Sequence, residues 1–183
     1  HIGLDMGITA LLTTSNGVEV ENPNYYRAGE RRLRVLSRAL ARKQKGGKNR
    51  LKAKKSVQRQ HLHVANQRSD YLHKLSTALV EDCDGVALED LATRNMVRNH
   101  HLSKSILDSG WGIFKDYLTY KAESAGREIR FVNPAYTSQD CSGCGWRVEK
   151  ELSERVHRCP NPDCLLVMDR DHNAAINILK KAG

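Results

Sequence analysis

Four cysteines in the last quarter of the chain have the spacing of a tetrahedral metal site. They form two pairs that are fourteen residues apart: Cys141-Ser-Gly-Cys144 and Cys159-Pro-Asn-Pro-Asp-Cys164. Two thiolate pairs at such a distance bind Zn²⁺, and glycines within and after the first pair permit a tight turn. A catalytic zinc needs an open coordination position, which four cysteines do not leave. The spacing therefore predicts one structural Zn²⁺, with His157 as an alternative ligand.

Three acids lie at or near the ends of expected core elements. Asp5 is set into the apolar run 2–6, Glu89 follows the apolar run that begins at residue 86, and Asp171 precedes a short helical pattern. If these acids meet in one pocket their charges repel one another, and bound divalent cations stabilise such an arrangement. Hard oxygen ligands select Mg²⁺ or Mn²⁺, and two such ions can promote phosphodiester hydrolysis. This combination predicts a metal-dependent nuclease.

Each acid taken alone has a plainer interpretation. A single buried Asp in a strand is often a satisfied cap or turn residue, and Asp171 directly follows Arg170, so a local ion pair would also account for it. Asp169 is a second candidate near the same helix start, as a cap or a supporting residue. The combination of the three acids, and not any one of them, carries the nuclease interpretation.

The charge of the chain is concentrated in one block. The net charge is +9, yet residues 27–59 alone hold 14 Lys and Arg with one acid, so the rest of the chain is net acidic. Such a block indicates a polyanionic partner, with a solvated helix pair as the plainer alternative. Because aromatic residues are only 5% of the chain, we do not expect base stacking to dominate the affinity. The candidate nucleic-acid contacts are Arg42, Lys43, Lys45, Lys48, Arg50, Lys52, Lys54 and Lys55.

The elements that must position these residues predict a mixed α/β fold. Residues 2–6, 8–14 and 18–21 favour three antiparallel strands, and residues 28–80 favour a helical hairpin that is broken near the glycines of segment 44–49. A strand at 86–91, a loop at 93–103, a helix at 106–125 with Leu107 facing the core, and a strand at 127–132 follow. Three antiparallel strands and then parallel strands joined by helices form a mixed sheet.

Three motifs resemble those of a RuvC-like nuclease domain of the ribonuclease H fold. They are Gly3-Leu-Asp-Met-Gly7, Leu88-Glu-Asp-Leu91 and Asp169-Arg-Asp-His-Asn-Ala-Ala175. More narrowly, Tyr136-Thr-Ser-Gln-Asp-Cys-Ser-Gly-Cys-Gly145 and the run from Lys43 to Arg50 resemble the TnpB (OrfB) proteins of bacterial insertion sequences, which are relatives of type V CRISPR effectors. The motifs occur in the family's order, and the similarity covers essentially the whole chain.

This resemblance implies an RNA-guided DNA endonuclease with Asp5, Glu89 and Asp171 as the ligands of two Mg²⁺ or Mn²⁺ ions. It implies a nuclease domain at 1–135, a zinc ribbon at 136–168 that helps to load the target strand, and a last motif with its helix at 169–183. Asp171 is chosen over Asp169 because it matches the acid of the family motif. The resemblance also implies a cytoplasmic, nucleoid-associated bacterial protein with DNA as substrate and a guide RNA as partner.

The chain departs from the family pattern in the second cysteine pair and in its extent. That pair has four intervening residues instead of two, and Leu165 follows it where the family often has Gly. Nothing here corresponds to the family's domains for guide RNA and for the DNA motif beside the target. Because the chain begins with His1 and enters a strand at once, we expect an upstream part to precede it.

Other classes of protein fit the sequence less well. A sugar-kinase or actin-type ATPase also starts with an acid in a strand turn, but it needs a second large lobe. A non-catalytic nucleic-acid-binding relative of the nuclease is expected to have lost one of the three acids. Four clustered cysteines with Cys83 apart suggest a reduced compartment, and the absence of an apolar run of about 18 residues argues against a membrane span.

Overall fold

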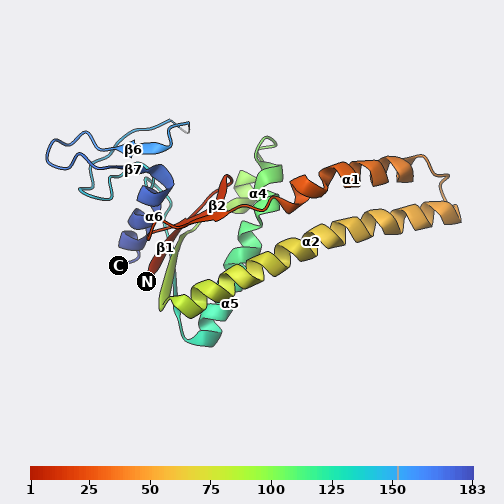
Figure 1. Ribbon diagram of the computed structural model, residues 1–183, viewed down its shortest axis with the longest axis horizontal. Helices are drawn as coiled ribbons and strands as arrows, with labels where there is room; N and C mark the ends of the chain where they lie inside the picture. Colours follow the sequence, from red (N-terminus) through yellow and green to blue (C-terminus); the bar gives the residue numbers. More distant parts are fainter. Residues whose placement is uncertain (152) are drawn as a thin grey trace.

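A five-stranded mixed sheet forms the centre of the molecule (Figure 1). The computed structural model describes residues 1–151 and 153–183. The sheet order is β3-β2-β1-β4-β5, with β1 (Ile2–Met6), β2 (Ala10–Thr14), β3 (Glu19–Glu21), β4 (Gly85–Glu89) and β5 (Glu128–Val132). The first three strands are antiparallel, and β4 and β5 run parallel to β1. The predicted mixed α/β sheet is therefore confirmed.

The two faces of the sheet have different covers. Leu4 and Leu88 face a core with residues of α2 (Lys48–Asp82) and α5 (Trp111–Ala125). Ala87 packs instead with Ile178 of α6 (Arg170–Lys181). Because side chains alternate along a strand, residues two apart share a face. The acids at positions 5 and 89 therefore lie on the α6 side of the sheet.

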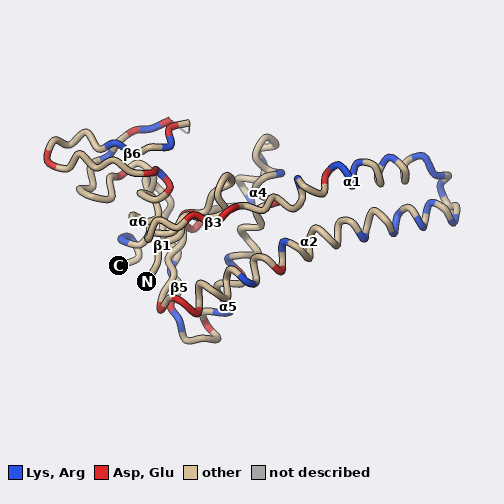
Figure 2. Tube along the Cα trace, in the orientation of Figure 1, with Lys and Arg blue, Asp and Glu red and all other residues tan. Residues whose placement is uncertain are grey.

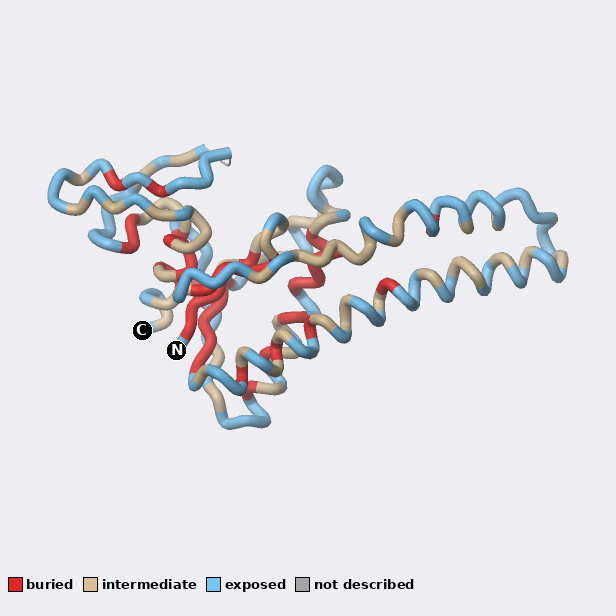
Figure 3. The backbone as a smooth tube through the Cα atoms, viewed as in Figure 1, coloured by how far each residue is buried: buried red, intermediate tan, exposed pale blue. Residues whose placement is uncertain are grey.

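A long helical hairpin extends away from the sheet (Figure 1). It consists of α1 (Tyr25–Ala41) and α2, which has 35 residues and is therefore about 50 Å long. Asp108 fixes the start of α1, since its carboxylate accepts hydrogen bonds from the amides of Tyr26 at 2.8 Å and Arg27 at 3.1 Å. Most residues of the distal half are exposed (Figure 3). The hairpin is thus anchored at its base and open to solvent at its tip.

The region between β4 and β5 differs from the sequence prediction. The expected loop at 93–103 contains α3 (Thr93–Met96) and the first residue of α4 (Ser103–Ser109). The expected continuous helix 106–125 is interrupted at Gly110, whose φ of 69° ends α4 and directly precedes α5. The interruption changes the direction of the apolar face, so Leu107 is 62% exposed where we expected a core residue, whereas Trp111 and Phe114 are buried.

Candidate active site and cysteine cluster

Asp5 and Glu89 are neighbours because β1 and β4 are parallel and in register. Leu4 lies opposite Leu88, so the two acids follow one step further along adjacent strands. Glu89 ends β4 and is 7% exposed. The pairing of two apolar strands therefore brings together acids that are 84 positions apart in the sequence.

Helix α6 brings Asp171 to the same end of the sheet. The helix packs directly on β1 at Gly3, where a Cβ atom would stand 2.2 Å from the carbonyl oxygen of Ala175 and 2.8 Å from the amide nitrogen of Leu179. Asp171 lies one turn before Ala175. Asp169 is the N-cap of the helix, and its carboxylate accepts from the amides of Asp171 at 2.8 Å and His172 at 3.0 Å.

The three acids line one open cavity of about 440 Å³. Its wall also includes hydroxyl and guanidinium groups, namely those of Thr137, Ser138, Arg155 and Arg170. The structure thus gathers the three acids that the sequence singled out.

The environment of the cavity raises the pKa values of Asp5 and Glu89 above their ordinary values. Burial raises the pKa of Asp5 well above its ordinary value, and the nearby carboxylates of Glu89 and Asp171 raise it further, while Arg170 acts in the opposite direction. Burial also raises the pKa of Glu89. This is the behaviour of like charges held together in a site of reduced solvation. A bound divalent cation would offset this repulsion between the carboxylates, so the three acids fit a divalent cation site.

Thr137 holds Glu89 in place and was missed by the sequence reasoning. Its hydroxyl donates a hydrogen bond to Oε1 of Glu89, and both residues are buried. The bond favours the ionised carboxylate and opposes the effect of burial on the pKa of Glu89. The position directly follows Tyr136 in the ribbon motif, but no sequence signal linked it to an acid 48 residues upstream.

Two arginines contact Asp171. Nε of Arg170 lies 3.0 Å from Oδ1, and a guanidinium nitrogen of Arg155 lies 3.6 Å from Oδ2. The local ion pair with Arg170 that the sequence left open is therefore present. Arg155 could not be foreseen, because it comes from the segment just before β6 (Val156–Arg158) and only the tertiary structure brings it to α6.

The four cysteine thiols meet as predicted. All four Sγ atoms lie within 4.8 Å of one another, and two pairs are 3.8 Å (Cys141 and Cys164) and 3.5 Å (Cys144 and Cys159) apart. A tetrahedron with Zn–S bonds of about 2.3 Å has sulfur atoms about 3.8 Å apart, so the arrangement fits Zn²⁺. The Trp146 amide lowers the pKa of Cys144 to about 7, which favours a thiolate.

His157 lies outside this cluster. Its ring is fully buried, and Nδ1 accepts a hydrogen bond from the ammonium of Lys150, which also donates to the Ser138 carbonyl at 2.6 Å. These contacts connect β6 with the start of the ribbon. His157 therefore has a packing role in this fold, and the alternative in which it replaces a cysteine finds no support.

The residue that follows the wider second cysteine pair has a strained backbone conformation. Leu165 has φ of 51°, the left-handed conformation that Gly145 adopts with φ of 79° after the first pair. Its amide and that of Cys164 both donate to the Asn161 carbonyl at 3.0 Å. Leu165 thus occupies a backbone position suited to glycine, which explains the family preference noted in the sequence.

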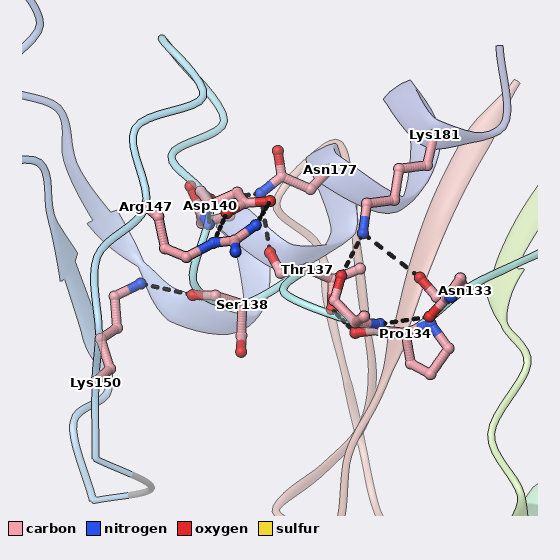
Figure 4. Close-up of polar contacts among 11 residues, drawn as sticks. Asn133, Pro134, Thr137, Ser138, Asp140, Arg147, Lys150, Asn177 and Lys181 are labelled. Atoms are coloured by element: carbon pink, nitrogen blue, oxygen red, sulfur yellow. Dashed lines mark hydrogen bonds and ion pairs between the residues drawn. The ribbon is translucent and has the colours of Figure 1, made fainter.

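Side chains of α6 attach the cysteine-bearing segment to the sheet domain (Figure 4). Asn173 is fully buried and accepts from the Ser142 amide at 2.9 Å while donating to the Asp140 carbonyl at 2.8 Å. Asn177 donates to the carbonyls of Thr137 at 2.9 Å and Asp140 at 2.6 Å. The helix that carries Asp171 is therefore the same helix that holds the first cysteine turn.

The basic block runs along α1 and through the tip into α2, and the candidate contact residues lie in the distal half of the hairpin (Figure 2). Seven of the eight candidate contact residues are exposed there, and Arg50 is half-buried. The Arg50 guanidinium donates to the carbonyls of Leu40 at 3.0 Å and Lys43 at 3.2 Å, so it ties the end of α1 to α2. The hairpin tip presents a dense positive surface, in which Arg50 has a structural part.

Comparison with known proteins agrees with this architecture. Residues 1–100 match the OrfB_IS605 family, described as "Probable transposase", and residues 111–178 match the "Cas12f1-like, TNB domain" family. The chain belongs to the OrfB_IS605 family. The OrfB match covers β1 to β4 with the hairpin, and the second match covers α5, the ribbon and most of α6.

The chain is similar to named proteins of other organisms, among them two bacterial ones. It is 41% identical over 97% of its length to a "Putative RNA-guided DNA endonuclease" of Streptomyces pristinaespiralis, and 37% identical over 97% to the "Putative RNA-guided DNA endonuclease InsQ" of Escherichia coli. It covers 44% and 48% of those proteins, so it spans about half their length. A solved Cas12f1–sgRNA–target DNA complex shares the fold, with a TM-score of 0.65 over 97% of this chain, 48% of that chain and 18% identity.

Proposed function

We propose that this chain is the nuclease part of an RNA-guided DNA endonuclease. The observation that carries the proposal is the gathering of Asp5, Glu89 and Asp171, from β1, β4 and α6, in one cavity. We propose these acids as ligands of two Mg²⁺ or Mn²⁺ ions. When bound, such ions supply an activated water and stabilise the leaving oxygen of a phosphodiester.

The chain's own residues prepare the cavity for a phosphodiester. Thr137 orients the Glu89 carboxylate through its hydrogen bond, which opposes the rise in the pKa of Glu89 that burial causes. Arg155 and Arg170 contact Asp171 from the cavity wall, where their N–H groups can also donate to phosphate oxygens. These guanidinium groups would offset the negative charge of a DNA strand beside three acids.

We propose the segment 136–168 as a zinc ribbon with one structural Zn²⁺ on the four cysteines, between a nuclease domain at 1–135 and a last motif at 169–183. The thiol geometry supports this assignment. The hydrogen bonds of Asn173 and Asn177 imply that the ribbon and the helix of Asp171 are positioned together. The ribbon would thereby place nucleic acid at the cavity, in keeping with the TNB family match.

The hairpin is proposed as a phosphate-backbone contact for DNA or guide RNA. Its exposed basic tip extends beyond the core, where a polyanion can reach it. Replacement of Lys52, Lys54 and Lys55 by Ala in the full-length protein should weaken nucleic-acid binding. The slope of log K against the logarithm of the salt concentration should become shallower by about one unit per lost phosphate contact. Lys74→Ala, at the base of the same helix, is the matched control and should leave the slope unchanged.

The relatives' names, and not a feature of these residues, support guidance by RNA. In such systems base pairing with the guide carries the sequence information, while the protein contacts backbone and a short flank. The full-length protein should therefore cleave a DNA target only when supplied with its RNA. Cleavage that is equally fast without RNA would contradict guidance but leave the nuclease assignment intact.

The nuclease assignment is tested with acid substitutions in the full-length protein. Asp5→Ala, Glu89→Ala and Asp171→Ala should abolish Mg²⁺- or Mn²⁺-dependent DNA cleavage while DNA binding survives. Asp90→Ala and Asp169→Asn are matched controls. Asp90 is an exposed neighbour of Glu89 paired with Lys115, and Asn retains the capping ability of Asp169. Undiminished cleavage by any of the three alanine variants would refute the assignment.

A non-catalytic nucleic-acid-binding relative is the second candidate. The observation in its favour is that Asp171 is engaged by two arginines, as an acid with a structural role would be. In that case the full-length protein would bind DNA but would not cleave it in the presence of Mg²⁺ or of Mn²⁺. Asp171→Asn would then lower the melting temperature and leave DNA binding unchanged.

A further inference from the structure

An exposed aromatic side chain stands beside the proposed nuclease cavity. Tyr136 lies between Pro134 and Thr137, which both line that cavity, and it is itself 51% exposed. The neighbouring turn also exposes Trp146, at 55%. In a chain poor in aromatic residues, an unburied ring at this place contributes little to the core.

The backbone of Tyr136 makes its residue type more unusual. Its φ of 66° lies in the left-handed region, which favours Gly or Asn over a residue with a large side chain. The carbonyl of Tyr136 accepts hydrogen bonds from the amides of Gln139 at 3.0 Å and Asp140 at 2.9 Å. These backbone bonds hold the turn, so the turn does not depend on the aromatic ring. Strained residues of this kind concentrate at functional sites.

A fixed arginine covers one face of the Tyr136 ring. The central guanidinium carbon of Arg147 lies 3.5 Å from the ring centroid. Asp140 holds that guanidinium through contacts of 2.9 Å to Nε and 3.4 Å to a terminal nitrogen (Figure 4). The stack is therefore ordered before any ligand arrives, and half of the tyrosine surface remains open to solvent.

Unpaired nucleobases bind to such surfaces. A base has a π-face that stacks on aromatic rings and on the guanidinium plane of arginine, whereas the bases of a duplex are covered by one another. We propose that the Tyr136–Arg147 stack binds an unpaired base of the DNA strand whose phosphate enters the cavity. This inference rests on the proposed nuclease function and assigns a base contact to the strand beside the acids. Charge on the hairpin and the stack both contribute affinity, and the stack also fixes the position of the strand.

The test measures equilibrium binding of fluorescein-labelled oligodeoxythymidine and oligouridine dodecamers to the full-length protein in Mg²⁺-free buffer. Tyr136→Gly removes the ring and suits the left-handed backbone, so its melting temperature should be at least that of the parent. It should weaken oligodeoxythymidine binding about tenfold. Tyr136→Phe should bind like the parent, as should Tyr120→Ala, which removes an exposed tyrosine of α5.

Three results would overturn the proposal. Parental affinity in Tyr136→Gly would do so, as would an equal loss in Tyr120→Ala, or a loss confined to oligouridine. If Tyr136→Gly does not fold, Tyr136→Asn takes its place, because Asn also tolerates this conformation. This binding assay is independent of the cleavage assay of the acid variants. If Tyr136→Gly loses binding while the alanine variants of the acids still cleave DNA at the full rate, the nuclease assignment is refuted and the stack is retained.

Discussion

Substitution of Gly3 by Ala is expected to displace the helix that carries Asp171. The added Cβ would stand 2.2 Å from the Ala175 carbonyl oxygen and 2.8 Å from the Leu179 amide nitrogen, and ordinary contacts begin at 3.4 Å. Because both atoms belong to the backbone of α6, no side-chain rotation relieves the overlap. The helix must move away from β1 by about 1 Å to restore ordinary contact.

The cost of this displacement can be estimated. Overpacking of a well-packed core lowers the free energy of unfolding by about 1 to 3 kcal/mol, and contacts with rigid backbone place Gly3→Ala near the upper value. For a chain of this size, about 3 kcal/mol corresponds to a melting temperature about 6 to 12 °C lower. A shift of about 1 Å at Asp171 would also slow cleavage by the full-length protein about a hundredfold.

The assay is thermal unfolding, with Gly112→Ala as the matched control. Gly112 lies in α5, and a Cβ there meets nothing within 4 Å, so the same substitution should be neutral or slightly stabilising. Ala175→Gly combined with Gly3→Ala should not restore stability, because the overlap is with the carbonyl oxygen. A Gly3→Ala protein that melts with the parent would refute the close packing of α6 on β1.

Three further predictions concern titration, backbone strain and zinc. Since the pKa of Asp5 is raised in the folded protein, its ionisation lowers the free energy of unfolding as pH rises from about 4 towards that raised pKa. Asp5→Asn should therefore melt above the parent at pH 7 in Mg²⁺-free buffer and converge with it near pH 4, and a constant difference would contradict this. Leu165→Gly should raise the free energy of unfolding by about 0.5 to 1 kcal/mol by relieving its left-handed backbone, which chemical denaturation can measure. Elemental analysis should find about one zinc per chain, and its removal by a chelator should lower the melting temperature, while a folded chain without zinc would exclude the site.

Much of the fold followed from local patterns in the sequence. Alternation and apolar runs located the five strands of the sheet, and the two glycines after Gln44 located the break in the hairpin. The helix break at Gly110 was missed, because a glycine within an apolar helical pattern is compatible with either a continuous or an interrupted helix. Leu107 was consequently assigned to the wrong environment.

The sequence by itself determined which acids and thiols are candidates for chemistry, because Asp5, Glu89 and the cysteine pairs stand in short motifs whose residue types limit what they can do. Tertiary structure decided what surrounds them. Thr137 reaches Glu89, and Arg155 reaches Asp171, only because α6 packs on Gly3 and binds the ribbon through Asn173. These contacts join residues far apart in the chain, and their geometry depends on packing that no local pattern encodes.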